Sequence, residues 1–175
     1  MKTIKPRVRA IAAVTIDGKI AKDEKHLSDW TSPEDKDFLH EKLDESDVVI
    51  VGNNTYQTAL EPLSKRNCMV VTRRVKTTKK ISENCRLVNL ENVDIIDLIN
   101  KNNYKIIDVL GGTQIYSWFL KNNLINDFYL TIEPVVFGSG RPLFEAGLTA
   151  ELRCRFVSIR KLNKKGSLLL HYKFT

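Results

Sequence analysis

Long hydrophobic runs are missing from this chain of 175 residues. No apolar stretch approaches the ~20 residues that cross a bilayer, so we expect no membrane span. Cysteine is scarce, with only Cys68, Cys85 and Cys154. They lack metal-ligand spacing, and their odd number without a signal-like N-terminus predicts reduced thiols, no bound metal and a cytoplasmic protein. The length suffices for a sizeable core without disulfides, so we expect one domain over residues 1–175.

Familiar phosphate-binding signatures are also missing, since the chain has neither a Walker sequence nor G-x-G-x-x-G. Acidic residues are in the minority, and 28 Lys and Arg against 21 Asp and Glu give a formal charge of +7. This excess favours anionic partners such as nucleic acid, phosphorylated metabolites or nucleotide cofactors. The basic runs 73–80 and 160–165 contain no interleaved aromatic residues. We therefore interpret them as solvated loops and disfavour nucleic acid as a partner.

The chain does contain an alternation of strand and helix patterns. Short β-branched runs predict strands at 8–14, 47–52, 68–72, 86–90 and 105–110. Amphipathic stretches predict helices at 32–43, from residue 54, at 93–102 and at 113–122. The last third reads as strand alone, at 127–138, 154–162 and 167–175. This order predicts an α/β fold with a central mixed, mostly parallel sheet, an antiparallel C-terminal hairpin and helices on both faces.

Two predicted strand-to-helix turns contain glycine, in "VGNNTY" (51–56) and "VLGGTQIY" (109–116). Such turns lie at the carboxyl ends of strands, where backbone can approach a phosphate closely. Thr72, Arg73 and Arg74 follow another predicted strand. Together these segments favour a dinucleotide, and an arginine there suits a ribose 2′-phosphate, hence NADPH over NADH. Tight turns without a ligand remain the alternative.

The stretch "DWTSPEDKDF" (29–38) predicts the start of a helix, with Ser32 as N-cap and Pro33 in the first turn. Asp35 stands where a capping box places its acidic member. At ~100° per residue, however, it also falls within an apolar stripe formed by Phe38, Leu39 and Leu43. An inward carboxyl has a raised pKa and can hold a proton near neutral pH. Asp35 is therefore either a capping residue or a group that a reaction uses.

In order and spacing, these segments resemble the dihydrofolate reductase superfamily, including the RibD-type C-terminal reductases of riboflavin synthesis. The similarity spans residues 8–174. The RibD-like segments are "TIDGKIA" (15–21), "SDWTSPED" (28–35) and "EPVVFGSGRPLF" (133–144). Other features resemble dihydrofolate reductase itself, namely the spacing of Trp30 and Asp35, "GNNTY" (52–56), "PLSKRN" (62–67), "GGTQIY" (111–116) and "YLTI" (129–132). The resemblance implies a single dihydrofolate reductase-like domain.

The resemblance also implies roles at the substrate. Asp35 would be the acid beneath the ring, steered by a hydrogen bond from Thr131, and Trp30 would lie near the ring and an ordered water. Leu39 would line the same pocket. Arg66 matches the residue that receives a glutamate carboxylate of folate. RibD-type reductases carry two arginines on the first helix for the substrate phosphate, and the matching positions are Lys36 and Leu43.

For the cofactor, the resemblance implies NADPH. Ala12 and Ile20 would flank the nicotinamide. The pyrophosphate and the nicotinamide side would be lined by Gly52, Gly111, Gly112, Thr113 and Tyr116. The adenosine half would be held by Thr55, Thr72 and Arg73. The position after Gly52 often carries Arg in dihydrofolate reductases, whereas this chain has Asn53.

The leading hypothesis is a reductase that transfers hydride from NADPH to a pteridine C=N bond, converting 7,8-dihydrofolate to 5,6,7,8-tetrahydrofolate. The alternative is reduction of 5-amino-6-(5-phosphoribosylamino)uracil, as in riboflavin synthesis. A third hypothesis is a basic nucleotide- or RNA-binding protein that keeps the fold without catalysis. The first two imply a small-molecule substrate. Both a monomer and a homodimer are compatible with the sequence.

Overall fold

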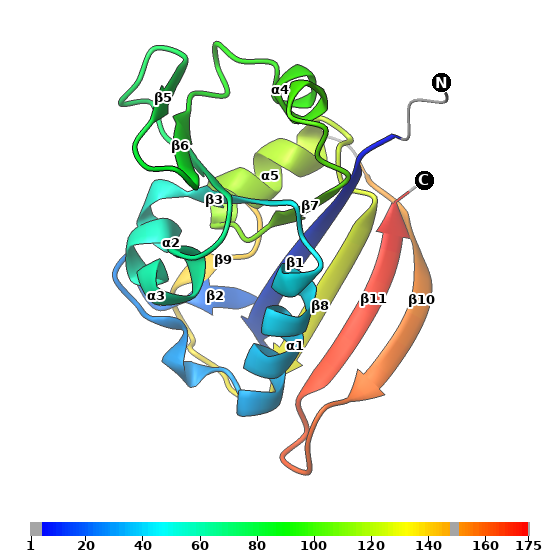
Figure 1. The fold of residues 1–175 in the computed structure, drawn as a ribbon. Coiled ribbons are helices and arrows are strands. Elements are labelled where there is room, and N and C mark those ends of the chain that lie inside the picture. Colours follow the sequence, from blue (N-terminus) through cyan, green and yellow to red (C-terminus); the bar gives the residue numbers. More distant parts are fainter. Residues whose placement is uncertain (1–4, 148–150, 175) are drawn as a thin grey trace.

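The computed structural model describes residues 5–147 and 151–174. Its main feature is a nine-stranded sheet in the order β10-β11-β8-β1-β7-β3-β4-β6-β5 (Figure 1). The sheet strands are β1 (Arg7–Thr15), β3 (Val48–Gly52), β4 (Cys68–Val71), β5 (Thr78–Lys80), β6 (Cys85–Val88), β7 (Ile106–Val109), β8 (Asp127–Glu133), β10 (Cys154–Lys161) and β11 (Leu168–Phe174). A separate pair is formed by β2 (Lys19–Ala21) and β9 (Arg141–Pro142). The helices are α1 (Pro33–Asp44), α2 (Asn53–Thr58), α3 (Leu60–Leu63), α4 (Ile95–Lys101) and α5 (Thr113–Lys121).

The sheet is mixed and mostly parallel. Strand β1 pairs in parallel with β7 and β8, β3 with β7 and β4, and β4 with β6. Strand β11 is antiparallel to both β8 and β10, which makes the C-terminal hairpin, and β5 adds an antiparallel edge. The predicted fold class is confirmed. The central strands are mostly apolar, as expected of strands covered by helices on both faces, apart from the buried ion pair of Arg9 on β1 with Asp108 on β7.

Alternate side chains of the strands pack against helices on opposite faces. On one face, Ile11 of β1 clusters with Phe38 of α1. On the other, Ala10 of β1 clusters with Ile115 and Phe119 of α5. Because side chains alternate along a strand, one buried strand serves both layers. Figure 1 shows α1 on the near side of the sheet and α5 on the far side of the sheet.

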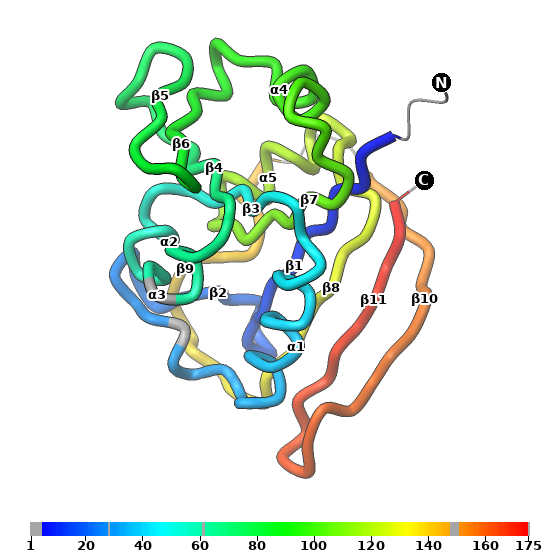
Figure 2. The backbone as a smooth tube through the Cα atoms, viewed as in Figure 1, coloured from blue at the N-terminus to red at the C-terminus, as the bar shows by residue number. Residues whose placement is uncertain are grey.

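The prediction of a strand over 127–138 is wrong in its second half, since β8 ends at Glu133. Pro134 has no N–H to donate to a ladder, and Val135 N turns back to Glu133 O at 2.8 Å. The chain then runs beside the segment that contains β2 (Figure 2), where β2 and β9 pair. The basic run 73–80, predicted as a loop, includes the exposed strand β5.

The predicted last strand reached Thr175, which lies outside the described residues. The rest of that strand is β11, whose residues pair with β8 from Leu168 to Lys173. Among the helices that the structure describes, none has the length and apolar character to cross a membrane. Over the same residues, no group of His, Cys, Asp and Glu side chains is arranged to hold a metal ion.

Candidate active site

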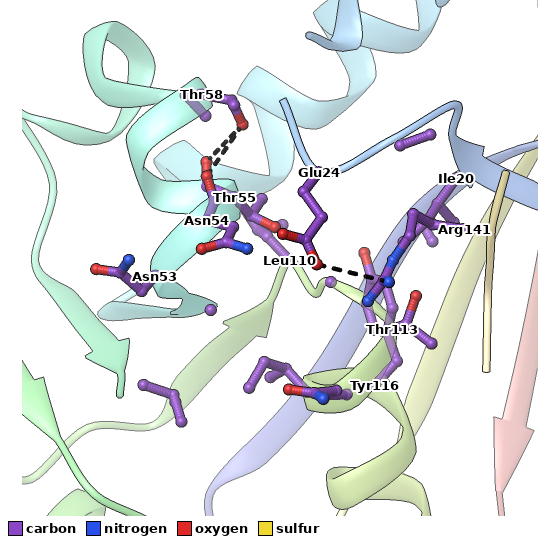
Figure 3. Close-up of a pocket in the computed structure, with 18 of the residues that line it drawn as sticks. Ile20, Glu24, Asn53, Asn54, Thr55, Thr58, Leu110, Thr113, Tyr116 and Arg141 are labelled. Carbon is purple, nitrogen blue, oxygen red and sulfur yellow. Dashed lines mark hydrogen bonds and ion pairs between the residues drawn. The ribbon is translucent and has the colours of Figure 1, made fainter. Parts of the chain in front are cut away.

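A cavity of about 880 Å³ opens where parallel strands of the sheet end and α1, α2 and α5 begin. Such a volume suits a small-molecule or cofactor site. In Figure 3, residues from the start of α2 (Asn53, Asn54, Thr55) and from α5 (Thr113, Tyr116) surround the same space. Most of the predicted site residues line it, namely Ala12, Ile20, Trp30, Asp35, Leu39, Gly52, Thr55, Thr72, Arg73, Gly112, Thr113 and Tyr116.

The two glycine turns meet each other at this cavity. Gly52 N donates a hydrogen bond to Gly111 O at 2.6 Å. A Cβ at Gly52 would lie 3.1 Å from Ile115 Cγ1, and a Cβ at Gly111 would collide with the Tyr116 ring. Gly111 also has φ +85°, in the left-handed region that favours glycine. Glycine is therefore required for the close approach of the two turns, although Gly111 itself does not line the cavity.

Helices α2 and α5 begin at these turns without a capping side chain, because their N-caps are Gly52 and Gly112. Backbone N–H groups of a first helical turn lack helical partners and bind anions well. At the end of β4, the exposed Arg73 and Arg74 add positive charge to the cavity wall. Neither forms an ion pair with any residue that the structure describes. Together these donors fit the pyrophosphate and 2′-phosphate of NADPH.

Tyr116 forms a buried wall of the cavity. Its hydroxyl donates to Ile11 O at 2.5 Å, and burial raises the pKa of the phenol, so the group stays neutral. Ala12, next along β1, has a small side chain at the same wall. Ile20 comes from β2, with its Cδ1 3.8 Å from the position of a Cβ at Gly112. These apolar surfaces fit a nicotinamide ring.

Asp35 is an ionisable group on the inward face of α1, where it is only 8% exposed. Burial raises the pKa of its carboxyl, while hydrogen bonds from the Thr131 and Thr31 hydroxyls lower it in part. Thr131 stands behind the carboxyl and does not line the cavity. The Asp35 carboxyl therefore combines contact with the cavity and a pKa above that of an exposed aspartate.

The capping prediction for α1 is confirmed for Ser32, whose Oγ accepts from Asp35 N at 3.3 Å. The acidic partner of the cap, however, is not Asp35. Ser32 N donates instead to Glu133 Oε1 at 2.8 Å, so a carboxylate from β8 takes the place of the helix's own acid. The Asp35 side chain is left for the cavity.

The cavity rim is built from the chain between β1 and α1. Trp30 packs edge to face on Phe137, with ring centroids 5.1 Å apart. Asp17 accepts from the backbone N–H groups of Phe137 and Gly138, at 3.1 and 2.9 Å. Figure 3 shows the ion pair of Glu24 with Arg141 at 3.6 Å. Sequence reasoning assigned no role to Glu24, Phe137 or Arg141.

Comparison with known proteins identifies the family. A family model described as the RibD C-terminal domain matches residues 6–167. The chain belongs to the RibD C-terminal domain family. The uncharacterized protein YwjB of Bacillus subtilis is 28% identical over 168 residues, 91% of this chain and 93% of YwjB.

Solved structures share the fold of this RibD C-terminal domain. Acinetobacter baumannii RibD superposes with a TM-score of 0.79 at 19% identity, and this chain spans 60% of that one. Dihydrofolate reductase from Enterococcus faecalis, complexed with NADP(H) and RAB-propyl, superposes with a TM-score of 0.69 at 18% identity. The alignment covers 98% of each chain. The predicted superfamily is confirmed.

Two basic residues of this RibD C-terminal domain were predicted to bind different candidate substrates, and only one of them lines the cavity. Arg66, predicted to receive a folate carboxylate, does not line the cavity. Its guanidinium donates to Asp44 Oδ1 and to Pro62 O, each at 2.5 Å. Lys36, beside Asp35 on α1, does line the cavity. Leu43, at the other predicted phosphate position, is buried in the core at 2% exposure.

Proposed function

We propose that this RibD C-terminal domain is an NADPH-dependent reductase of a phosphorylated aminopyrimidine nucleotide, 5-amino-6-(5-phosphoribosylamino)uracil. The observation that carries the proposal is that Asp35 and Lys36 both line the cavity, while the Arg66 side chain is bound to Asp44 outside it. A carboxyl whose pKa is raised by burial, next along the helix to an ammonium group, suits a substrate that needs a proton and bears a phosphate. The family membership and the fold of RibD support the same substrate class.

The geometry of the sheet separates the two ends of the bound molecules. Thr72 and Arg73 follow β4, while Asp35 lines the cavity together with Ala12 and Ala13 near the end of β1. Strands β1, β7, β3 and β4 are neighbours in that order, so β4 lies three strand spacings from β1, about 14 Å. The adenosine half of a dinucleotide fits at β4, which leaves the region of Ala12, Ile20 and Tyr116 for the nicotinamide next to Asp35.

Bound NADPH would supply a hydride to C1′ of the substrate ribose, which forms a C=N bond with the amino nitrogen once the C1′–O4′ bond opens and the N–H proton moves to O4′. The chain's own residues orient the two molecules and manage one proton. The glycine turns and the start of α5 hold the pyrophosphate. Thr131 and Thr31 hold the Asp35 carboxyl, which gives a proton to the substrate nitrogen as its carbon receives hydride. Lys36 binds the substrate phosphate.

A second candidate is 7,8-dihydrofolate. The contact between Asp35 and Thr131 and the fold shared with Enterococcus faecalis dihydrofolate reductase favour it. The position of Arg66 disfavours it, since the glutamate carboxylate of folate lacks the receptor that the resemblance implied.

Oxidation of NADPH by the purified protein, followed by absorbance with each substrate in turn, tests this proposal. We expect rapid oxidation with the aminopyrimidine nucleotide and slow or no oxidation with dihydrofolate. The opposite preference would support the second candidate. If neither substrate is reduced and NADPH does not bind, while RNA binds with a steep dependence on salt, the protein is a non-catalytic nucleic-acid binder.

A further inference from the structure

Glu133 is a buried carboxylate that does not line the cavity and has no assigned role. It is the last residue of β8 and is only 4% exposed. Side chains two positions apart on a strand point to the same face. Glu133 therefore lies on the same side of the sheet as Thr131, the residue that holds Asp35.

The hydrogen bonds of Glu133 lead directly to Asp35. Glu133 Oε1 accepts from Ser32 N at 2.8 Å and from Ser32 Oγ at 2.7 Å, and Oε2 accepts from Ser167 Oγ at 2.5 Å. Ser32 Oγ in turn accepts from Asp35 N at 3.3 Å. Two residues thus connect β8 to the backbone of the candidate acid.

A second connection keeps this arrangement in place. The side-chain amide of Asn163, in the turn between β10 and β11, donates to Glu34 Oε2 at 3.1 Å and to Ser167 Oγ at 2.9 Å. The first turn of α1 is therefore tied to the C-terminal hairpin as well as to β8. A group held at several points keeps its geometry while a substrate binds and leaves.

We propose that Glu133 is a positioning residue for the reduction, which fixes the Asp35 carboxyl against Thr131 through Ser32 and places a negative charge beside it. This inference rests on the proposed function of Asp35 as proton donor. A nearby negative charge favours the neutral form of a carboxyl. Glu133 therefore adds to the effect of burial, which is the larger cause of the raised pKa of the Asp35 carboxyl.

The charged and titratable groups that face Asp35 come from three elements. Glu133 on β8 raises the pKa of Asp35, and Lys36 on α1 lowers it. Tyr116 on α5 is neutral, with its hydroxyl engaged by Ile11 O. Burial is the main cause of the raised pKa of Asp35, and the charge of Glu133 adds to it, so the pKa of Asp35 should fall when that charge is removed.

The test compares Glu133→Gln with Glu133→Asp. Gln keeps an acceptor for Ser32 but has no charge. As pH rises, the rate of NADPH oxidation should therefore begin to decline at a lower pH than in the wild type. Asp keeps the charge but is too short for the bonds to Ser32, so kcat should drop while the pH profile stays in place. A loss of kcat without movement of the profile in Glu133→Gln would reduce Glu133 to a structural residue and overturn the proposal.

Asp37→Asn is the matched control, since it removes a negative charge from the same helix at an exposed position outside this hydrogen-bond network. Its pH profile should match the wild type, and a shift equal to that of Glu133→Gln would also overturn the proposal. Carboxyl NMR titration of Asp35 in the ligand-free protein, assigned with Asp35→Asn, gives the same comparison without turnover. If the wild type reduces neither substrate, the proposed function fails, whereas this titration still decides whether Glu133 raises the pKa of Asp35.

Discussion

Asp35 is a side chain whose placement costs the folded protein stability. Burial raises its pKa, so the folded state holds the proton more tightly than the unfolded chain does. Its contribution is most favourable below the unfolded pKa of about 3.9 and is lost as pH rises through the folded pKa. Strained or desolvated groups of this kind are typical of functional sites.

Asp35→Asn should therefore raise the Tm at mildly alkaline pH, because the amide is neutral at every pH. The advantage should shrink as pH falls through the folded pKa and vanish well below pH 4, where the wild-type carboxyl is protonated in both states. Thermal unfolding across pH measures it. Asp108→Asn is the contrasting variant, since Asp108 is paired with the buried Arg9 at 2.6 Å and its loss should cost about 3–5 kcal/mol. A lower Tm for Asp35→Asn at alkaline pH would contradict the account.

The turns after β3, β4 and β7 together form one side of the cavity, the side proposed to hold the cofactor. Glycine after β3 and β7 lets two helix starts come together, and β4 contributes Arg73 and Arg74 instead of a helix. If the proposed function holds, the choice between NADPH and NADH rests on this third turn, since the two cofactors differ only in the ribose 2′-phosphate.

Replacing Arg73 and Arg74 together by Ala should weaken NADPH binding about tenfold or more, because a hydrogen bond to a charged group contributes about 1.5–3 kcal/mol. NADH binding should change little. Titration of cofactor fluorescence measures both. Ala at Lys79 and Lys80 is the matched control, since these exposed residues of β5 carry the same charge but do not line the cavity. Equal losses for both cofactors would assign the arginines to the pyrophosphate instead.

Sequence patterns anticipated the elements with a strong local signal. The apolar spacing of Phe38 and Leu43 predicted that Asp35 points inward, and the structure buries it. Local signals could not show that Asp44 engages Arg66 from 22 residues away, or that Glu133 caps α1 from 101 residues away. The strand prediction continued to residue 138 and so did not show that β8 ends at Glu133. The role of Glu133 at the end of the strand was therefore not predicted.

Across the molecule, the site depends on segments from almost the whole chain. Strand β1 supplies Ala12, α1 supplies Asp35, and β8 supplies Thr131 behind it. The C-terminal hairpin is connected to the start of α1 because Ser167 Oγ donates a hydrogen bond to Glu133, which also binds Ser32. A parallel sheet brings these distant segments to one edge. Several short motifs in a fixed order therefore predict the site better than any single motif does.

The rate of hydride transfer in a single turnover is the most direct test of the central claim, that Asp35 supplies the proton for a reduction in this cavity. NADPH labelled with deuterium at C4, bound to the enzyme and mixed with the aminopyrimidine nucleotide, should pass its deuterium to the product in the wild type. Asp35→Asn should slow that transfer by about 10²–10⁴-fold with nearly unchanged NADPH affinity. Transfer at wild-type rates across pH in Asp35→Asn would contradict the account.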